Sequence, residues 1–203
     1  MNNPIAYSQD TVRKIMSKLA FALNKFTNGK VSPNSITIVG LLGHLIIAYL
    51  IINNNFVIAA IMLIVFGLFD SLDGALARIQ KSSSKQGMLL DSITDRVKEI
   101  IIYASIAFAL ISNGNSYNAV WVVLACGASL LVSYINAWGE AINKTNSHAK
   151  NKQFRTGFMS YDIRVFTVIL GLLTGYIEQA IIFITIFAFY TAGVRFFGVL
   201  KNL

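Results

Sequence analysis

The sequence predicts an all-α membrane protein with six transmembrane helices, preceded by an amphipathic helix on the cytoplasmic surface of the membrane. The first observation is composition: 55% of the 203 residues are hydrophobic and only 13% are charged, whereas soluble domains average about 25% charged residues. The second is that six segments are apolar over the roughly 20 residues that a membrane-spanning helix needs. These segments are 35–53, 56–79, 88–111, 118–142, 158–175 and 179–200.

The apolar segments use most of the chain, so we expect two parts: a juxtamembrane helix in residues 1–30 and one six-helix domain in residues 31–203. Between residues 12 and 26, apolar side chains recur at helical spacing while lysines and arginines occupy other faces. This pattern is typical of a helix that lies in the membrane interface. Packing against the transmembrane helices or a partner protein is the alternative. Gly29 favours the end of this helix, and Pro33 favours the start of the first span.

The third observation is the distribution of basic residues, which predicts the orientation. The three expected outer loops, 53–55, 112–118 and 176–178, contain no Lys or Arg. Cytoplasmic loops carry an excess of these residues, so both termini and the longer loops are expected to face the cytoplasm, with the protein integral to the cytoplasmic membrane. The net charge of +8 then reflects orientation and attraction to anionic lipid, and we expect no nucleic-acid partner.

Four aspartates interrupt the apolar pattern in the second and third spans. Asp70 and Asp73 are three residues apart and share one helix face, and Asp91 and Asp95 are four apart and do the same. Since the two spans are antiparallel and joined by a short polar turn, the two pairs should lie at similar depth near the cytoplasmic end. Carboxylates are costly inside a membrane and tend to mark ion, metal or substrate sites.

The residue types around the aspartates indicate phosphate chemistry. Neighbouring carboxylates do not all remain ionised unless cations neutralise them, and their hard oxygens suit Mg²⁺, Mn²⁺ or Ca²⁺ better than zinc. Arg78 supplies a fixed positive charge for a phosphate. Gly74, Ala77 and Gly87 are small, which either admits a ligand such as a nucleotide or allows two helices to pack tightly.

The spacing from Asp70 to Asp95 is D-x2-D-G-x2-A-R-x8-G-x3-D-x3-D. It resembles, at every fixed position, the signature of the CDP-alcohol phosphotransferase family. The layout is similar to small members that make phosphatidylinositol phosphate, phosphatidylglycerophosphate or phosphatidylserine. The resemblance implies a membrane enzyme of phospholipid biosynthesis that moves a substituted phosphate from a CDP-linked alcohol to another alcohol and releases CMP. It also implies a homodimer that needs Mg²⁺ or Mn²⁺.

The same resemblance implies roles for individual residues. The carboxylates would hold two divalent ions, with Asp95 completing the second ion's site and also acting as the general base toward the acceptor hydroxyl. The implied metal ligands are Asp70, Asp73, Asp91 and Asp95. The residues implied to line the pocket for the CDP moiety are Gly74, Ala77, Arg78 and Gly87.

The sequence leaves both substrates open. Residues 133–140 resemble a segment that phosphatidylinositol phosphate synthases carry with two arginines, but Asn136 and Trp138 stand at those places here. Arg155 and Arg164 are the candidate residues for a phosphorylated acceptor, and Arg164 also suits a side chain that snorkels to the membrane surface. Inositol phosphate, glycerol phosphate, serine or another small polar alcohol fits as acceptor. The lipid donor is CDP-diacylglycerol or CDP-archaeol.

Two other functions are compatible with carboxylates at this place. The same aspartates could transfer a CDP-linked headgroup to a free diacylglycerol. A divalent-cation transporter would need polar residues that continue toward the outer side, whereas residues 56–69 and 100–111 are almost wholly apolar. The cluster therefore opens to one side only, which disfavours transport.

Overall fold

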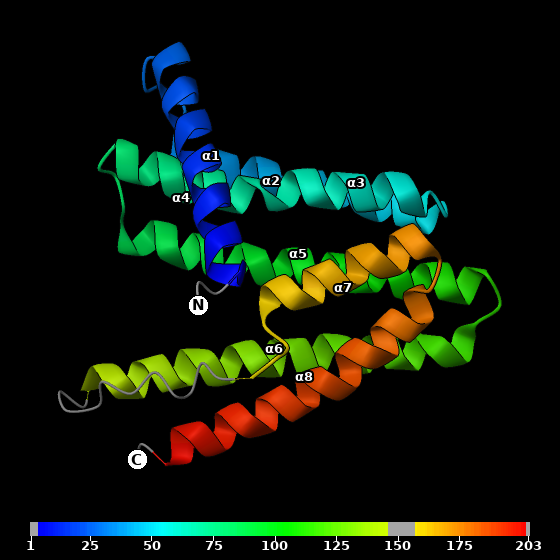
Figure 1. The fold of residues 1–203 in the computed structure, drawn as a ribbon. Coiled ribbons are helices and arrows are strands. Elements are labelled where there is room, and N and C mark those ends of the chain that lie inside the picture. The colour runs from blue at the N-terminus through cyan, green and yellow to red at the C-terminus, as the bar shows by residue number, and fades with distance from the viewer. Residues whose placement is uncertain (1–3, 146–156, 202–203) are drawn as a thin grey trace. The chain divides into compact units, whose positions relative to one another are not determined.

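The computed structural model describes residues 4–145 and 157–201, with side chains from residue 14 to 142 and from 157 to 201. Every regular element in these residues is an α-helix, which confirms the predicted all-α class. The helices are α1 (Pro4–Phe26), α2 (Pro33–Ile52), α3 (Phe56–Gly67), α4 (Phe69–Ile79), α5 (Lys85–Ser112), α6 (Ser116–Thr145), α7 (Tyr161–Thr174) and α8 (Ile177–Leu200) (Figure 1).

Four segments of the described chain are long and apolar enough to cross a membrane. They are Pro33–Ile52, Phe56–Ile79, Ser116–Ile142 and Ile177–Leu200. Large apolar side chains on these segments are exposed; Leu42, Tyr49 and Val123 are examples. Because so many exposed apolar side chains on a soluble protein would promote association, these surfaces fit contact with lipid, and the chain is an integral membrane protein.

The other two predicted spans, 88–111 and 158–175, correspond to helices α5 and α7, but neither helix belongs to this set of four. The first half of α5 carries the charged run Asp95, Arg96, Lys98 and Glu99, together with Asp91. The helix α7 has 14 residues, fewer than the roughly 20 that cross a hydrocarbon core. It ends at Thr174 and is followed by Gly175, whose φ of 79° is the left-handed conformation that glycine adopts readily.

The predicted boundary between α1 and α2 is confirmed. Helix α1 ends at Phe26, and Asn28 and Gly29 follow with φ angles of 50° and 73°. Their backbone amides bond to the carbonyls of Lys25 and Asn24, which satisfies groups that the helix end leaves without partners. Pro33 is the first residue of α2, where its missing N–H costs no helical hydrogen bond.

The chain divides into two compact units. The first comprises Met1–Ile47 and Ile61–Ile101. In this unit α1 packs across α4, with Ala20 of α1 buried in one cluster with Ile36, Ala75 and Leu76. Beside the packed face, Ile15, Leu19 and Phe26 of α1 are exposed, and Phe26 is 88% exposed. Helix α1 therefore uses one face for packing and leaves a second apolar face uncovered.

The second unit comprises Ala48–Ala60 and Ile102–Leu203, and α6, α7 and α8 form its main core. The buried residues of the core are Ala128, Val132, Ile135, Met159, Ala188 and Ala192. The Met159 amide donates a 3.1 Å hydrogen bond to Thr191 Oγ1, which ties the start of α7 to α8. At the other end of α8, Glu178 accepts 2.6 Å hydrogen bonds from Asn115 and Asn118.

Candidate active site

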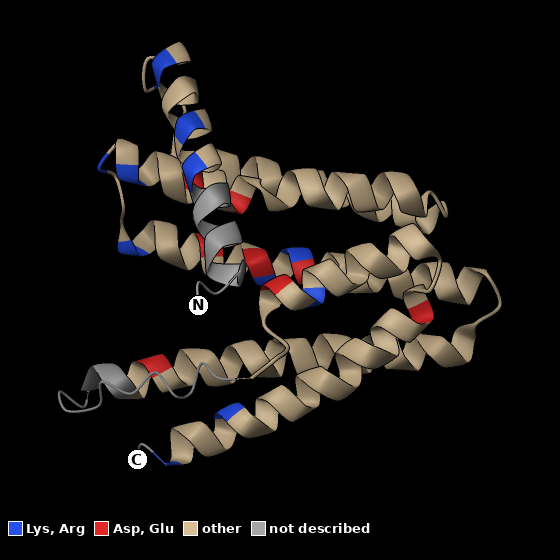
Figure 2. Cartoon of the chain, viewed as in Figure 1, with Lys and Arg blue, Asp and Glu red and all other residues tan. Residues whose placement is uncertain are grey.

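Helix α4 carries the first half of the candidate site. Neither α2 nor α3 contains Lys, Arg, Asp or Glu (Figure 2). The next charged residue along the chain is Asp70, in the first turn of α4. A single turn residue, Leu68, separates α3 from α4, so the two helices form one apolar run that becomes polar at Asp70. After Ile79 the chain turns through Lys81, whose φ is 52°. This is the short polar turn that the sequence predicts.

Helix α5 carries the second half, and a serine fixes its start. Ser84 Oγ accepts a 3.0 Å hydrogen bond from the Gly87 amide, as an N-cap residue does. The chain runs in opposite directions along α4 and α5, so the two helices extend from the turn toward the same side (Figure 1). The helix that follows the turn therefore brings Asp91 back toward Asp73.

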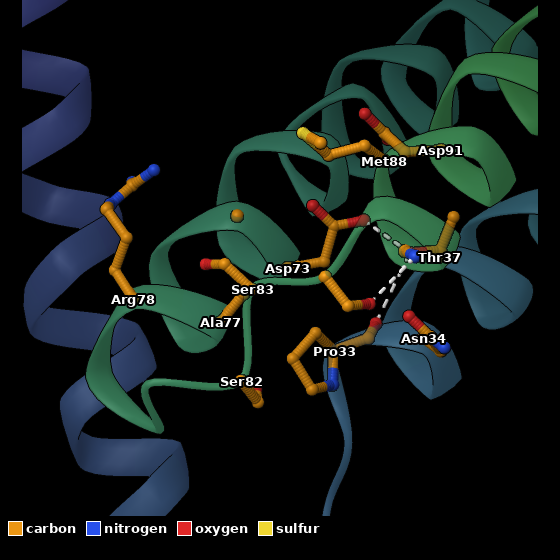
Figure 3. Close-up of a pocket in the computed structure, with 13 residues that line it drawn as sticks. Pro33, Asn34, Thr37, Asp73, Ala77, Arg78, Ser82, Ser83, Met88 and Asp91 are labelled. Atoms are coloured by element: carbon orange, nitrogen blue, oxygen red, sulfur yellow. Dashed lines mark hydrogen bonds between the residues drawn. The ribbon is translucent and has the colours of Figure 1, made fainter.

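A pocket of about 220 Å³ lies between the start of α2, α4, the turn and the start of α5 (Figure 3). Six of the signature residues line it, together with residues that the sequence analysis did not assign to the site. The signature residues are Asp73, Gly74, Ala77, Arg78, Gly87 and Asp91. The others are Pro33, Asn34, Thr37, Ser82, Ser83, Ser84 and Met88. The signature residues other than Asp70 and Asp95 therefore lie at one cavity in the first unit.

The two glycines of the pocket differ in what surrounds them. A Cβ placed on Gly74 would meet only the Arg78 guanidinium, at an ordinary 3.7 Å. A Cβ on Gly87 would lie 3.3 Å from Ser84 Oγ and 3.4 Å from Asn34 Oδ1. A methyl group at Gly87 would therefore press on two neighbouring side chains, whereas at Gly74 the neighbouring residues leave room for one, and the glycine leaves that part of the pocket open.

Asp73 is held in place by α2. Its side chain is 6% exposed, and its Oδ2 accepts a 2.6 Å hydrogen bond from Thr37 Oγ1. The Thr37 hydroxyl also lies 3.3 Å from the Pro33 carbonyl, within the first turn of α2 (Figure 3). A buried carboxylate needs such a partner, because burying an unpaired charge is costly.

Asp70 and Asp95 do not line the pocket but share a buried lysine. The ammonium nitrogen of Lys98 lies 2.5 Å from Asp70 Oδ1 and 3.4 Å from Asp95 Oδ1. The Lys98 side chain is only 1% exposed. Arg96 adds a longer contact of 3.9 Å to Asp95 and pairs with Glu99 at 3.5 Å.

The aspartates therefore form two pairs, one at the pocket and one around Lys98. Their oxygens, with the hydroxyl of Thr37, are the hard donors that Mg²⁺ and Mn²⁺ prefer, so the donor set fits a divalent ion. In the part of the chain that the structure describes, no three acidic, histidine or cysteine side chains converge closely enough to hold one ion as they are placed. Binding by all four carboxylates thus requires their side chains to move together.

Of the two candidate acceptor residues, the structure describes Arg164. Arg164, in the first turn of α7, belongs to the second unit and is 1% exposed. It donates a 3.1 Å hydrogen bond to the Met159 carbonyl, and its guanidinium lies 5.9 Å from the centre of the Tyr161 ring. A side chain so buried is not a surface-snorkelling anchor. Arg155 lies outside the described residues.

The two positions that depart from the inositol-phosphate pattern have local partners on α6. Asn136 Nδ2 lies 3.4 Å from Glu140 Oε1, one helical turn on. Trp138 is 53% exposed and meets Tyr134 edge to face. Neither side chain carries the positive charge that an arginine would bring to a phosphate.

Sequence reasoning did not assign to the site two side chains that contact the signature aspartates, Lys98 and Thr37. Lys98 follows Asp95 by three residues, and a lysine inside an apolar segment is itself a signal of a functional or paired charge. Thr37 gave a weaker signal, since a threonine near the start of a helix commonly bonds its own backbone. Only the approach of α2 to α4 shows that its hydroxyl also reaches Asp73.

Comparisons with known proteins identify the family of this chain. Residues 30–192 match the CDP-alcohol phosphatidyltransferase family. The chain is 33% identical over 138 residues to the phosphatidylinositol phosphate synthase of Corynebacterium glutamicum, an alignment that covers 65% of this chain and 57% of that protein. The chain therefore spans little more than half the length of this curated relative.

Solved structures share the fold. The Mycobacterium tuberculosis phosphatidylinositol phosphate synthase with CDP-DAG bound superimposes with a TM-score of 0.80 at 20% identity, over 93% of this chain and 94% of that one. The same enzyme in complex with manganese and citrate gives a TM-score of 0.80 at 20% identity, over 92% and 89%. Because the family match covers most of the sequence, the chain belongs to the CDP-alcohol phosphatidyltransferase family.

Proposed function

We propose that the protein transfers a phosphatidyl-type or archaetidyl group from a CDP-lipid to a polar alcohol and releases CMP, as a step of phospholipid biosynthesis. The observation that carries this proposal is the pocket in which Asp73, Gly74, Arg78 and Asp91 meet. The family match supports the reaction type. The CDP-DAG bound to the mycobacterial enzyme supports CDP-diacylglycerol as donor, with CDP-archaeol the other candidate.

The residue roles follow the signature. Asp70, Asp73, Asp91 and Asp95 would hold two Mg²⁺ or Mn²⁺ ions, and the manganese complex of the mycobacterial enzyme supports the choice of metal. When bound, such ions neutralise the pyrophosphate and the departing CMP. Gly74, Ala77, Arg78 and Gly87 would bind the CDP moiety. Of these, Arg78 supplies the positive charge and Gly74 the space.

Asp95 would act as the general base. It takes the proton from the acceptor hydroxyl while that oxygen bonds to the phosphorus carrying the lipid. The bond from this phosphorus to the oxygen of CMP breaks, and CMP leaves. A positioned carboxylate typically contributes about 10²–10⁴-fold to such a proton transfer.

We propose that all six predicted segments cross the cytoplasmic membrane, with α5 and α7 completing the set, and that the termini and the pocket face the cytoplasm. Residues 1–30 would lie at the interface and residues 31–203 would form the catalytic domain. The exposed apolar face of α1 and the outer loops without basic residues support this orientation. The family resemblance supports a homodimer.

The acceptor is proposed to be a small polar alcohol, with Arg155 and Arg164 binding its phosphate if it carries one. The C. glutamicum relative is a phosphatidylinositol phosphate synthase, which makes inositol phosphate the first acceptor to test. Glycerol phosphate and serine remain candidates, because Asn136 and Trp138 replace two arginines of the inositol-phosphate pattern.

The test is CMP release by the purified protein with Mn²⁺ or Mg²⁺, using CDP-diacylglycerol or CDP-archaeol with inositol phosphate, glycerol phosphate, serine or inositol. We expect one donor and acceptor pair to release CMP, and Asp91→Asn to abolish the release. A separate reaction with CDP-choline and diacylglycerol tests the alternative in which a CDP-linked headgroup is transferred to a free diacylglycerol. No CMP release from any combination would contradict the proposed function.

A further inference from the structure

Lys98 is a cation that the fold itself supplies to the aspartate cluster. Its ammonium bridges Asp70 on α4 and Asp95 on α5, at 2.5 and 3.4 Å. The two carboxylate side chains are 22% and 20% exposed, whereas the lysine is 1% exposed. The ammonium thus lies on the buried side of the pair and joins the two helices there.

The surroundings of Lys98 keep it at this position. On α2, Gly40 faces the lysine, and a Cβ at that residue would lie 3.8 Å from the ammonium nitrogen. The nearby His44 is buried, with its Nδ1 2.8 Å from the Gly40 carbonyl. A buried ammonium is costly unless carboxylates pair with it, so Asp70 and Asp95 are the partners that make this lysine tolerable.

The pocket pair has different partners. Asp73 is bonded to Thr37, and Asp73 and Asp91 face the cavity. A divalent ion that enters the pocket therefore meets these two carboxylates first. An ion shared by Asp70 and Asp95 would need the place that the ammonium holds, and two cations a few ångströms apart repel each other strongly at a buried site.

We propose that Lys98 is a displaceable internal cation of the metal site: it occupies the position between Asp70 and Asp95, and a second divalent ion binds there only when the ammonium withdraws. This inference rests on the proposed function. The four-carbon stem of lysine gives the ammonium the freedom to withdraw. Lys98 is then a positioning residue that acts through Asp70 and Asp95. It makes the ion between Asp70 and Asp95 bind more weakly than the ion at Asp73 and Asp91.

The experiment measures binding of Mn²⁺ alone, by loss of the electron paramagnetic resonance signal of free Mn²⁺, to detergent-purified protein stripped with a chelator. Lys98→Met and Lys98→Gln remove the charge, Lys98→Arg keeps it, and Lys85→Met is the control at an exposed lysine of the same helix. We expect the weaker Mn²⁺ site of the neutral variants to bind at least about tenfold more tightly than that of wild type. Lys98→Arg and Lys85→Met should keep the wild-type affinity.

The unfolding temperature provides an independent test of whether a divalent ion replaces the Lys98 ammonium. Without metal the neutral variants should unfold at a lower temperature than wild type, since two carboxylates lose their partner, and Mn²⁺ should raise their unfolding temperature more than it raises that of wild type. Unchanged or weaker Mn²⁺ binding in both neutral variants overturns the inference. If wild type still releases CMP in that case, only the role of Lys98 fails. A wild-type protein that neither binds Mn²⁺ nor releases CMP overturns the proposed function as well.

Discussion

The Thr37 hydroxyl on α2 donates a 2.6 Å hydrogen bond to Asp73 on α4, across 36 positions of sequence. Asp73 is buried, and this bond aims one of its oxygens while the carboxylate lines the pocket. Thr37 therefore connects the start of the first span to the aspartate signature. Thr37 and Asp73 both line the cavity, so loss of this bond should change the position of the Asp73 carboxylate at the pocket (Figure 3).

Replacing Thr37 with valine keeps the shape of the side chain and removes the donor. A hydrogen bond to a charged group contributes roughly 1.5–3 kcal/mol, so we expect kcat/KM for CMP release to fall about 10- to 100-fold if most of that energy serves the transition state. Thr185→Val is the matched control, because Thr185 is also a buried, hydrogen-bonded threonine but lies on α8. Equal loss in both variants would indicate general destabilisation instead.

Asp95→Asn tests the general base. The amide retains the size of the carboxylate but does not accept the proton of the acceptor hydroxyl, so CMP release should fall at least about 100-fold. Binding of radiolabelled CDP-diacylglycerol should persist, because Asp95 does not line the pocket. Glu99→Gln is the control on the same helix. Turnover of Asp95→Asn at the wild-type rate would remove Asp95 from this role.

The sequence predicted well those features that local chemistry determines. The positive φ angles at Asn28 and Gly29, the proline that starts α2 and the polar turn after α4 follow from residue type alone. Helical spacing and a short turn were also enough to bring Asp73 and Asp91 to one cavity. Five of the six predicted apolar segments each correspond to one helix, within a few residues at each end, and segment 56–79 corresponds to α3 and α4 together.

Features that depend on the approach of distant segments were not predicted. The pairing of Lys98 with Asp70 depends on how α4 and α5 meet, and periodicity gives no distance between side chains on two helices. The break at Leu68 was missed because the apolar run continues through it. The burial of Arg164, whose guanidinium donates to the Met159 carbonyl, was not predicted, because an arginine at a helix end has the same sequence pattern whether it is buried or exposed.

Gly74→Ala separates binding from folding. The added methyl group makes only an ordinary contact with Arg78 and replaces a glycine within a helix, so stability should be unchanged or rise by up to about 1 kcal/mol. The methyl group nevertheless enters the cavity wall, and we expect the KM for the CDP-lipid to rise severalfold. Thermal unfolding and CMP release, measured on the same preparation, check both parts. A fall in stability with unchanged KM would contradict the assignment of Gly74 to the pocket.

Gly171→Ala should have the opposite effect to Gly74→Ala: lower stability with an unchanged KM for the CDP-lipid. A Cβ at this position would lie 2.7 Å from that of Ala180 and 3.1 Å from the Ile177 backbone, so α7 and the start of α8 must separate slightly. Overpacking of this kind typically costs about 1–3 kcal/mol. Gly127→Ala on α6 is the control, because no atom lies within 4 Å of its added Cβ. We expect a lower unfolding temperature for Gly171→Ala only. Equal unfolding temperatures for the two variants would show that α7 and α8 tolerate the methyl group.

Arg164→Gln tests whether the acceptor carries a phosphate. The guanidinium is buried beside the Met159 carbonyl, and a glutamine can still donate a hydrogen bond there, so the fold should be retained. With a phosphorylated acceptor, the lost charge should raise the acceptor KM by roughly tenfold or more and flatten its dependence on salt. The KM for the CDP-lipid should not change.

Arg195→Gln is the matched control for Arg164→Gln, since Arg195 is a second buried arginine of the same unit that bonds a backbone carbonyl, that of Val132. If Arg164 binds the acceptor phosphate, only its own variant should lose salt-dependent acceptor affinity, while both variants bear a similar cost in unfolding temperature. An unchanged acceptor KM in Arg164→Gln, with an uncharged acceptor giving the highest rate, would assign Arg164 to the packing of α7 alone.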